Sequence, residues 1–231
     1  MNYSFILLAA GKGVRLGKST PKQFLPLAGK PMIVHTLERV DKLHQVTEII
    51  VVCSLDYVSV IQSYAENYGI KKMIRYIEGG SSRQESVFNG LLAASENMVI
   101  IHEAARPLVS IREFEELIHF PYNNVTFSYS IPFTVLKKSN NGIISDILNR
   151  EELVNIQLPQ KFSKDVLLAC HEKAKAAHRL FTEDASIVKF YSDTPIHCIP
   201  GSASNIKITE YTDMLFGEIL YKEKFMEESI T

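Results

Sequence analysis

Residues 5–30 read FILLAAGKGVRLGKSTPKQFLPLAGK, and this stretch decides the fold that we expect. Its apolar start, residues 5–10, is short enough for a buried strand and stops at a glycine, where a regular element usually ends. A loop rich in glycine and cations follows, with Gly11, Gly13, Gly17, Lys12, Arg15, Lys18 and Lys22. Glycine has no Cβ, so backbone N–H groups of such a loop can approach an anion closely, and the cations add charge. The stretch therefore predicts a strand followed by a polyphosphate-binding loop.

Two familiar phosphate-binding motifs do not fit this loop. The dinucleotide fingerprint needs its third glycine one residue before Gly17, and this misplaced glycine argues against a dehydrogenase. The P-loop motif needs a glycine where Lys12 stands, and Pro21 interrupts the helix that should follow. A solvated turn with incidental lysines is the remaining alternative. The strand before the loop, Arg15 within it and Lys22 directly after a proline form a compound pattern that favours a binding site.

Length, charge and cysteine content restrict the class of protein. The chain has 231 residues with 46% hydrophobic content, which fits one domain over residues 1–231. A net charge of -1 gives no support for general nucleic-acid binding. Cys53, Cys170 and Cys198 lie far apart without C-x-x-C spacing, which predicts buried free thiols. The chain lacks a signal-peptide pattern and an apolar run near the ~20 residues of a membrane span, so we expect a soluble cytoplasmic protein that binds no membrane.

Helix and strand patterns alternate after the first loop. We expect helices at about residues 31–40, 56–68, 163–177 and from 210 onwards, and strands at about residues 47–53, 73–77, 98–101, 125–130, 196–199 and 206–208. Gly69 is expected to end the second helix as its C′ residue. Such alternation predicts an α/β fold with a largely parallel sheet, whose ligands lie at the carboxyl ends of the strands.

Residues 131–150 interrupt this alternation. Asn141-Gly142 stands between apolar segments and is a strong signal for a β-hairpin. A hairpin of this size has little core of its own, so it is stable only when it packs on something else. We therefore expect a protruding arm that needs a partner surface.

The first stretch resembles the nucleotide-binding signature of 2-C-methyl-D-erythritol 4-phosphate cytidylyltransferases, whose close relatives are the ribitol 5-phosphate cytidylyltransferases. The matching residues are A-A-G-x-G-x-R-L-G from Ala9 and P-K-Q-F-L-x-L-x-G-K-P from Pro21. Family members join a sugar-alcohol phosphate to CTP in the non-mevalonate isoprenoid pathway. The resemblance implies a single-domain Rossmann-like nucleotidyltransferase fold, with a mixed, mostly parallel sheet flanked by helices and a protruding β-arm. It also implies Mg²⁺ as cofactor and catalytic roles for Arg15 and Lys22.

A second motif, Gly79-Gly80-Ser81-Ser82-Arg83-Gln84-Glu85-Ser86-Val87, is similar to the family pattern G-G-x-x-R-x-x-S-V, whose backbone and serine hold the cytosine. The resemblance implies that the nucleotide is bound by Ala9, Ala10, Gly11, Gly13, Gly80, Ser81, Ser86 and Glu103. The same segment is also a plausible helix start capped by Ser81 or Ser82. The two interpretations are compatible.

The third motif, His102-Glu103-Ala104-Ala105-Arg106-Pro107, resembles H-D-A-A-R-P. In the family the carboxylate lies beside the ribose, the phosphates and Mg²⁺, and the arginine faces the acceptor. Glu103 replaces the aspartate, and its extra methylene would move a ligand oxygen by roughly an ångström or more, which argues against Glu103 as a Mg²⁺ ligand. His102 is interpreted as a structural histidine.

Further similarities imply an acceptor site shared between two subunits. In the family, the arm at residues 131–150 clasps a second subunit, and an arginine at the place of Arg150 reaches the neighbour's acceptor site. Thr182 of T-E-D-A-S and Lys207 of N-I-K-I-T are similar to family residues that contact the acceptor phosphate, and Thr182 is also expected to be the N-cap of a helix. The resemblance thus implies a homodimer with Arg106, Arg150, Thr182 and Lys207 as acceptor ligands.

The five motifs span nearly the whole chain and predict transfer of a cytidylyl group from CTP to 2-C-methyl-D-erythritol 4-phosphate, with release of pyrophosphate. Leu158 stands where the family has a threonine, which would remove a hydroxyl from the acceptor pocket. Glu103 is a second departure, and near Thr134 the arm is about one residue shorter than the pattern. Ribitol 5-phosphate or another polyol phosphate therefore stays open as the acceptor, as does a non-catalytic CTP-binding protein.

Overall fold

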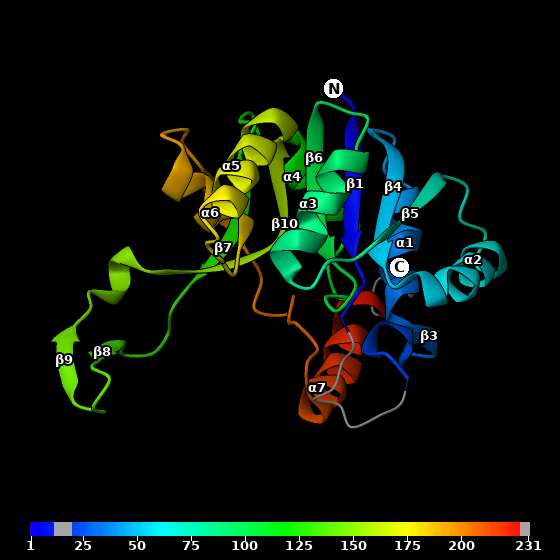
Figure 1. The fold of residues 1–231 in the computed structure, drawn as a ribbon. Coiled ribbons are helices and arrows are strands. Elements are labelled where there is room, and N and C mark those ends of the chain that lie inside the picture. The colour runs from blue at the N-terminus through cyan, green and yellow to red at the C-terminus, as the bar shows by residue number, and fades with distance from the viewer. Residues whose placement is uncertain (12–19, 227–231) are drawn as a thin grey trace.

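The computed structural model describes residues 1–11 and 20–226, so Gly13 and Arg15 of the first loop lie outside the described residues. Its centre is a seven-stranded sheet with the strand order β11-β7-β10-β6-β1-β4-β5 (Figure 1). The strands are β1 (Tyr3–Leu8), β4 (Val46–Cys53), β5 (Met73–Glu78), β6 (Met98–Glu103), β7 (Val125–Ser130), β10 (Val154–Ser163) and β11 (His197–Pro200). Neighbouring strands run parallel, except that β10 is antiparallel to β6 and β7. The mixed, mostly parallel sheet is therefore confirmed.

Helices cover both faces of the sheet. Successive residues of β1 point to opposite sides of it, so apolar side chains on both faces need cover. All of β1 is buried between β4 and β6. Phe5 and Leu7 belong to one core, Ile6 and Leu8 to another. Over the first core lie α1 (Met32–Asp41), α2 (Val58–Asn67) and α4 (Ile111–His119). Over the second lie α3 (Arg83–Ala93), α5 (Lys164–Ala176) and α6 (Asp184–Tyr191) (Figure 1).

A third, smaller apolar cluster lies below the carboxyl ends of the strands as drawn in Figure 1. It joins α7 (Tyr211–Tyr221) to the short antiparallel pair β2 (Pro26–Leu27) and β3 (Lys30–Pro31). Gly217 permits this packing, since a Cβ there would lie 3.1 Å from Ile208 Cδ1 and 3.2 Å from Leu27 Cδ1. The remaining helical turns are the 3-10 helices Lys22–Phe24, Leu55–Tyr57 and Arg150–Glu152 and the π-helical turn Lys222–Met226.

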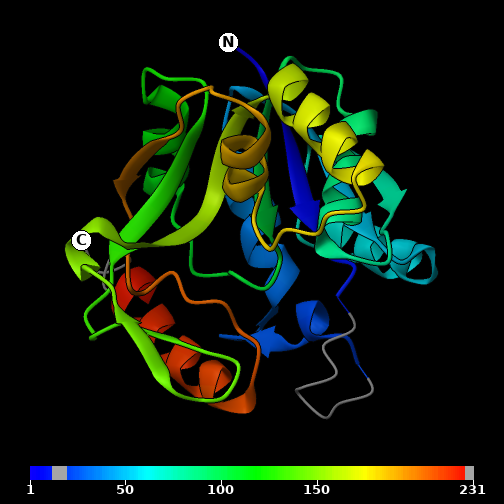
Figure 2. The ribbon, with the colours of Figure 1, turned by 60° about the vertical axis from the view of Figure 1, so that its left-hand side comes forward.

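The arm projects from the body of the molecule as a hairpin of β8 (Leu136–Lys138) and β9 (Ile144–Ile147) (Figures 1 and 2). Gly142 has φ +80° in the turn, as the Asn-Gly signal predicted. Apolar side chains on the arm stand open, with Phe133 75% and Ile147 77% exposed. The hairpin is therefore confirmed, and residues 1–11 and 20–226 leave these apolar side chains uncovered.

The expected helices and strands are present to within a few residues, with two exceptions. Residues 206–208 form no strand; they run as an extended segment in which the Ile208 N–H donates to the Ala105 carbonyl oxygen at 2.8 Å. Thr182 is not an N-cap, because α6 begins one residue later with Glu183 as its N-cap. Gly69 follows α2 with φ +66°, as expected of a C′ glycine. No helix in residues 1–11 and 20–226 has the length and apolar character needed to cross a membrane.

Candidate active site

A cleft of about 620 Å³ opens at the carboxyl ends of β1 and β6. From β1 the chain moves to β4 on one side, whereas β6 lies on the other, so this is the point where the strand order reverses. Open α/β sheets bind ligands at such a switch point. The lining contains Ala9, Ala10, Gly11, Lys22, Gln23, Gly79, Gly80, Ser81, Ser82, Arg83, Ser86, Glu103, Ala104, Ala105 and Lys207. The structure thus brings together most of the nucleotide-binding residues that the resemblance implies.

Two chain segments meet tightly at one wall of the cleft. The Ala9 N–H donates to the Val52 carbonyl oxygen at 2.7 Å, and Gln23 Nε2 donates to the Ala9 carbonyl oxygen at 2.7 Å. Gly79 lies so near that a Cβ on it would be only 2.4 Å from Ala10 Cβ. Glycine is therefore required here for the loop after β5 to contact the loop after β1.

The start of α3 forms the next part of the wall. Ser82 is its N-cap, and its Oγ accepts from the Glu85 N–H at 3.1 Å. Ser86 Oγ accepts from the Gly80 N–H at 3.1 Å and donates to the Ser82 carbonyl oxygen at 2.9 Å. Of the two expected caps, Ser82 is correct, while Ser81 instead donates to Glu85. The serines thus fix the loop whose backbone faces the cleft.

Glu103 ends β6 at the floor of the cleft between two cations. Its Oε1 accepts from Arg83 Nε at 3.0 Å, and its Oε2 lies 2.7 Å from Lys207 Nζ. Burial alone would raise the pKa of Glu103, but the charges of Lys207 and Arg83 outweigh burial and hold this pKa at about 2. The carboxylate is therefore ionised and fully paired at neutral pH.

This arrangement does not fit a resident Mg²⁺. Glu103 is the only carboxylate among the described residues that line the cleft, and cations occupy both of its oxygens. The described part of the chain also holds no group of three His, Cys, Asp or Glu side chains suited to a metal ion. Mg²⁺ prefers several oxygen ligands in near-octahedral geometry, which these residues do not supply.

Lys207 lies at the boundary between this cleft and a second pocket of about 380 Å³, because it lines both. The second pocket is lined by Arg106, Tyr129, Asn155, Ile156, Gln157, Ala203, Asn205, Ile206 and Lys207. Its mixture of a guanidinium, an ammonium and amides suits a phosphorylated polyol. Among the described residues, Lys207 is thus the cation that can reach ligands in both spaces.

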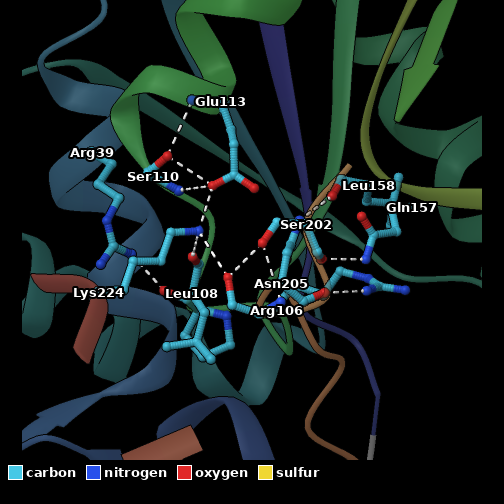
Figure 3. Close-up of polar contacts among 12 residues, drawn as sticks. Arg39, Arg106, Leu108, Ser110, Glu113, Gln157, Leu158, Ser202, Asn205 and Lys224 are labelled. Carbon is cyan, nitrogen blue, oxygen red and sulfur yellow. Dashed lines mark hydrogen bonds and ion pairs between the residues drawn. The ribbon is translucent and has the colours of Figure 1, made fainter. Parts of the chain in front are cut away.

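A loop of backbone and amide contacts holds Arg106 (Figure 3). Arg106 Nη1 donates to the Asn205 carbonyl oxygen at 2.8 Å, and Asn205 Nδ2 donates to the Leu158 carbonyl oxygen at 2.7 Å. Gln157 Nε2 donates to the Ser202 carbonyl oxygen at 2.8 Å. Burial lowers the pKa of Arg106, although Glu103 and other acidic groups oppose that effect. The guanidinium is thus bound through Nη1 beside the second pocket.

Leu158 corrects one expectation. Its side chain is 1% exposed and belongs to the apolar core under α3 and α5, and it lines neither pocket. The expected loss of a hydroxyl from the acceptor pocket is therefore wrong as a statement about a pocket wall. The residue takes part in the site through its carbonyl oxygen, which any residue type would supply.

Arg150 and Thr182 are not brought to Lys207 within one chain. Arg150 lines a separate hollow of about 640 Å³ at the base of the arm and pairs there with Glu151 at 3.2 Å. Thr182 is exposed and lines neither the cleft nor the second pocket. Lys22, by contrast, lines the cleft, and its Nζ donates to the Ile208 carbonyl oxygen at 3.2 Å.

His102 agrees with its interpretation as a structural residue. It is fully buried, and its Nε2 lies 3.0 Å from the Arg106 carbonyl oxygen. Burial lowers its pKa to about 4, so the ring is neutral at neutral pH. Sequence reasoning gave no role to Arg83 or Gln23, although both stand inside the quoted motifs.

Comparison with known proteins agrees with this geometry. The model of the IspD family, 2-C-methyl-D-erythritol 4-phosphate cytidylyltransferase, matches residues 4–223. A protein of that name from Clostridium botulinum (strain 657 / Type Ba4) is 36% identical over 219 residues, covering 93% of this chain and 95% of the relative. One from Geobacillus kaustophilus is 36% identical over 232 residues, covering 98% and 100%.

A solved structure is similar as well. The crystal structure of 4-diphosphocytidyl-2C-methyl-D-erythritol synthase from Anaerococcus prevotii superposes with a TM-score of 0.85 and 29% identity, covering 96% of each chain. The chain belongs to the 2-C-methyl-D-erythritol 4-phosphate cytidylyltransferase family.

Proposed function

We propose that this protein transfers a cytidylyl group from CTP to 2-C-methyl-D-erythritol 4-phosphate and releases pyrophosphate, as a step of isoprenoid precursor synthesis. The observation that carries the proposal is the position of Lys207 at the boundary of two pockets. The larger cleft presents glycine and serine backbone suited to a base and phosphates, and the smaller pocket presents Arg106. Family membership supports the same reaction.

The reaction needs charge neutralisation more than proton transfer. An acceptor phosphate oxygen attacks the α-phosphorus of CTP, a new P–O bond forms, and the bond to the β-phosphate breaks to release pyrophosphate. The nucleophile is already anionic near neutral pH, so no general base is required. Lys22 from the cleft wall and Lys207 from the shared boundary lower the repulsion between substrates and stabilise charge on the α-phosphate. Arg15 has the same role by family resemblance.

In this proposal Mg²⁺ enters with CTP as the counter-ion of its phosphates. The described residues do not fit a resident metal, since Arg83 and Lys207 already pair Glu103. Glu103 then acts by fixing those two cations rather than by ligating metal. Phosphate oxygens and water are sufficient ligands for such a substrate-bound ion.

The acceptor site is completed, we propose, by Arg150 of a second copy. The exposed apolar side chains of the arm support a homodimer through residues 131–150, because a hairpin without a core needs a surface to pack on. The position of Arg150 away from the second pocket of its own chain fits the same arrangement. Cys53 and Cys170 are buried as expected, whereas Cys198 is exposed, and these free thiols suit a cytoplasmic enzyme.

Pyrophosphate release from CTP and Mg²⁺ tests the proposal, with 2-C-methyl-D-erythritol 4-phosphate and ribitol 5-phosphate assayed in parallel. We expect turnover with the first and a kcat/KM at least about 100-fold lower with the second. Turnover with ribitol 5-phosphate alone would replace the acceptor. CTP binding without turnover of either compound would instead identify a non-catalytic CTP-binding protein.

A further inference from the structure

We propose that Arg83 and Asp184 are positioning residues that hold Lys207 in place through Glu103. The proposal rests on the proposed function, because it assigns Lys207 to the acceptor phosphate. Asp184 lines neither pocket and touches no substrate space. Its influence on the reaction therefore passes through other side chains.

A continuous chain of alternating contacts leads from the buried helices to the cleft. His171 Nε2 of α5 donates to Asp184 Oδ1 at 3.1 Å, and Asp184 Oδ2 lies 2.9 Å from Arg83 Nη2. Arg83 Nε donates to Glu103 Oε1 at 3.0 Å, and Glu103 Oε2 lies 2.7 Å from Lys207 Nζ. The series thus joins α5, α6, α3 and β6 to the boundary of the two pockets.

Burial makes this chain rigid. The side chains of Asp184 and His171 are 0% and 1% exposed, and that of Glu103 is 7% exposed. Buried charges need well-placed partners, so losing one partner leaves an uncompensated charge and forces its neighbours to move. Lys207, at 37% exposure, is the open end of the chain and can still meet a ligand.

Arg83 stands between three carboxylates, since Glu183 Oε2 also lies 3.2 Å from its Nη2. Burial alone would raise the pKa of Asp184, but Arg83 and His171 outweigh burial and lower it. Burial is likewise the largest influence on Glu183, whose pKa stays raised. A planar guanidinium holds its N–H donors in a fixed fork, whereas the donors of a lysine ammonium rotate at the end of a flexible stem, so an arginine fixes the relative positions of its partners.

The orientation of Glu103 depends on this division of contacts. Arg83 holds one carboxylate oxygen, so only the other is available to Lys207. Without Asp184 the Nη2 of Arg83 loses its buried partner, so the guanidinium moves and its Nε contact with Glu103 Oε1 is weakened; that oxygen can then also bind the ammonium. Lys207 is then drawn toward Glu103 and away from an acceptor phosphate.

Asp184→Asn tests the proposal, because it keeps side-chain shape and removes the charge that Arg83 binds. We expect kcat/KM for 2-C-methyl-D-erythritol 4-phosphate to fall roughly 10- to 100-fold, mainly through a higher KM. The Kd of CTP, measured by calorimetry without acceptor, should change by less than about twofold. Arg83→Lys serves as the second variant if Asp184→Asn unfolds, and it should raise the acceptor KM in the same way; its CTP affinity is not a control, because Arg83 lines the cleft.

Two controls separate positioning from general destabilisation. Arg75→Lys alters another arginine–glutamate pair, Arg75 with Glu48 at 3.4 Å, and should leave both constants unchanged. In a Lys207→Met background, Asp184→Asn should cause no further rise in the Kd of the acceptor, measured by calorimetry, because residues of one network are not additive. An equal further rise there, or an equal loss of CTP affinity, would overturn the proposal.

Failure of the proposed function gives a different result. If the wild type turns over no methylerythritol phosphate, the function is wrong, and crystal structures of wild type and Asp184→Asn decide the positioning separately. An altered contact between Glu103 and Lys207 Nζ in the variant supports positioning. An unchanged contact refutes it, whatever the acceptor.

Discussion

Lys22 lies where a single charge can decide the rate. It begins a 3-10 helix directly after Pro21 and lines the cleft beside the Ile208 carbonyl oxygen. We expect Lys22→Ala to lower kcat roughly 10²- to 10³-fold, because it removes a cation aimed at developing charge. Lys30→Ala is the matched control, since Lys30 pairs with Glu38 outside the cleft. Steady-state kinetics and a thermal melt check both, and activity of Lys22→Ala within a factor of about two of wild type would refute its role.

Glu103 gives a separate test of how Mg²⁺ enters. Glu103→Gln keeps an acceptor for Arg83 Nε but removes the charge that holds Lys207. We expect the Mg²⁺ concentration for half-maximal activity to stay within about twofold, while the acceptor KM rises. The measurement is a Mg²⁺ titration at saturating CTP. A rise of about tenfold or more in that concentration would show that Glu103 ligates the metal after all.

Two buried histidines predict that the free energy of unfolding depends on pH. Burial lowers the pKa of His35 and of His102 to about 4, from the ordinary 6.5. A histidine whose pKa is lower in the folded than in the unfolded state stabilises the folded protein above pH 6.5. This stabilisation is lost as the pH falls toward 4, because the unfolded state then binds the proton. For His102, which is fully buried, the loss amounts to about 3 kcal/mol.

Unfolding by guanidinium chloride at pH 7 and at pH 4.5 measures this loss of stability. We expect the free energy of unfolding of the wild type to fall from pH 7 to pH 4.5. The free energy of unfolding of His102→Asn should be lower at pH 7 but should fall less over the same range. His44→Asn is the matched control, because His44 is exposed and should leave the wild-type slope unchanged. Equal slopes in wild type and His102→Asn would show that His102 does not titrate with folding.

At the scale of elements, contact between two loops shapes the nucleotide cleft. A Cβ at Gly79 would meet Ala10 Cβ at 2.4 Å, so Gly79→Ala must push the loop after β5 away from the loop after β1. We expect the Kd of CTP to rise about tenfold or more by calorimetry. Gly90→Ala also forces a contact, 2.7 Å from Ile6 Cγ2, but inside α3. It should lower the melting temperature and spare CTP affinity, and the opposite pattern would contradict this assignment.

The sequence allowed prediction of elements with strong periodicity, but not of the tertiary contacts made by irregular segments. β1 reads correctly because its apolar run is buried on both faces between parallel neighbours. Residues 206–208 have the same β-branched character, yet the backbone of Ile208 bonds to Ala105 rather than to a strand, which is a tertiary choice. Thr182 is not the N-cap because Glu183 takes that position and α6 begins at Asp184.

The motifs of the candidate site could be predicted from the sequence, but the contacts between side chains of different motifs could not. The glycine and serine positions around Gly80 and Ser86 follow from local patterns. The link from Asp184 through Arg83 to Glu103 joins residues far apart in sequence, and spacing carries no information about such pairs. The burial of Leu158 is equally a property of the packed sheet.

At the scale of the whole molecule, the arm predicts that activity is shared between two copies. Arg150 lies at the base of the arm and Lys207 at the cleft, in different pockets of one chain. We expect Arg150→Ala and Lys207→Met each to be nearly inactive alone. When the two variants are unfolded together, refolded and mixed in equal amounts, half of the dimers carry one lesion of each kind. In these mixed dimers the subunit with intact Lys207 receives Arg150 from its partner, so about a quarter of wild-type activity should return.

The control for this mixing experiment places both substitutions on one chain and mixes that double variant with wild type. Its mixed dimers contain no complete site, so activity should fall below the value for unmixed proteins. Sizing chromatography of the wild type at micromolar concentration should show a dimer, because the exposed apolar side chains of residues 131–150 need cover. A monomer, or mixed dimers without recovered activity, would mean that Arg150 serves its own chain or none, and the shared acceptor site would be refuted.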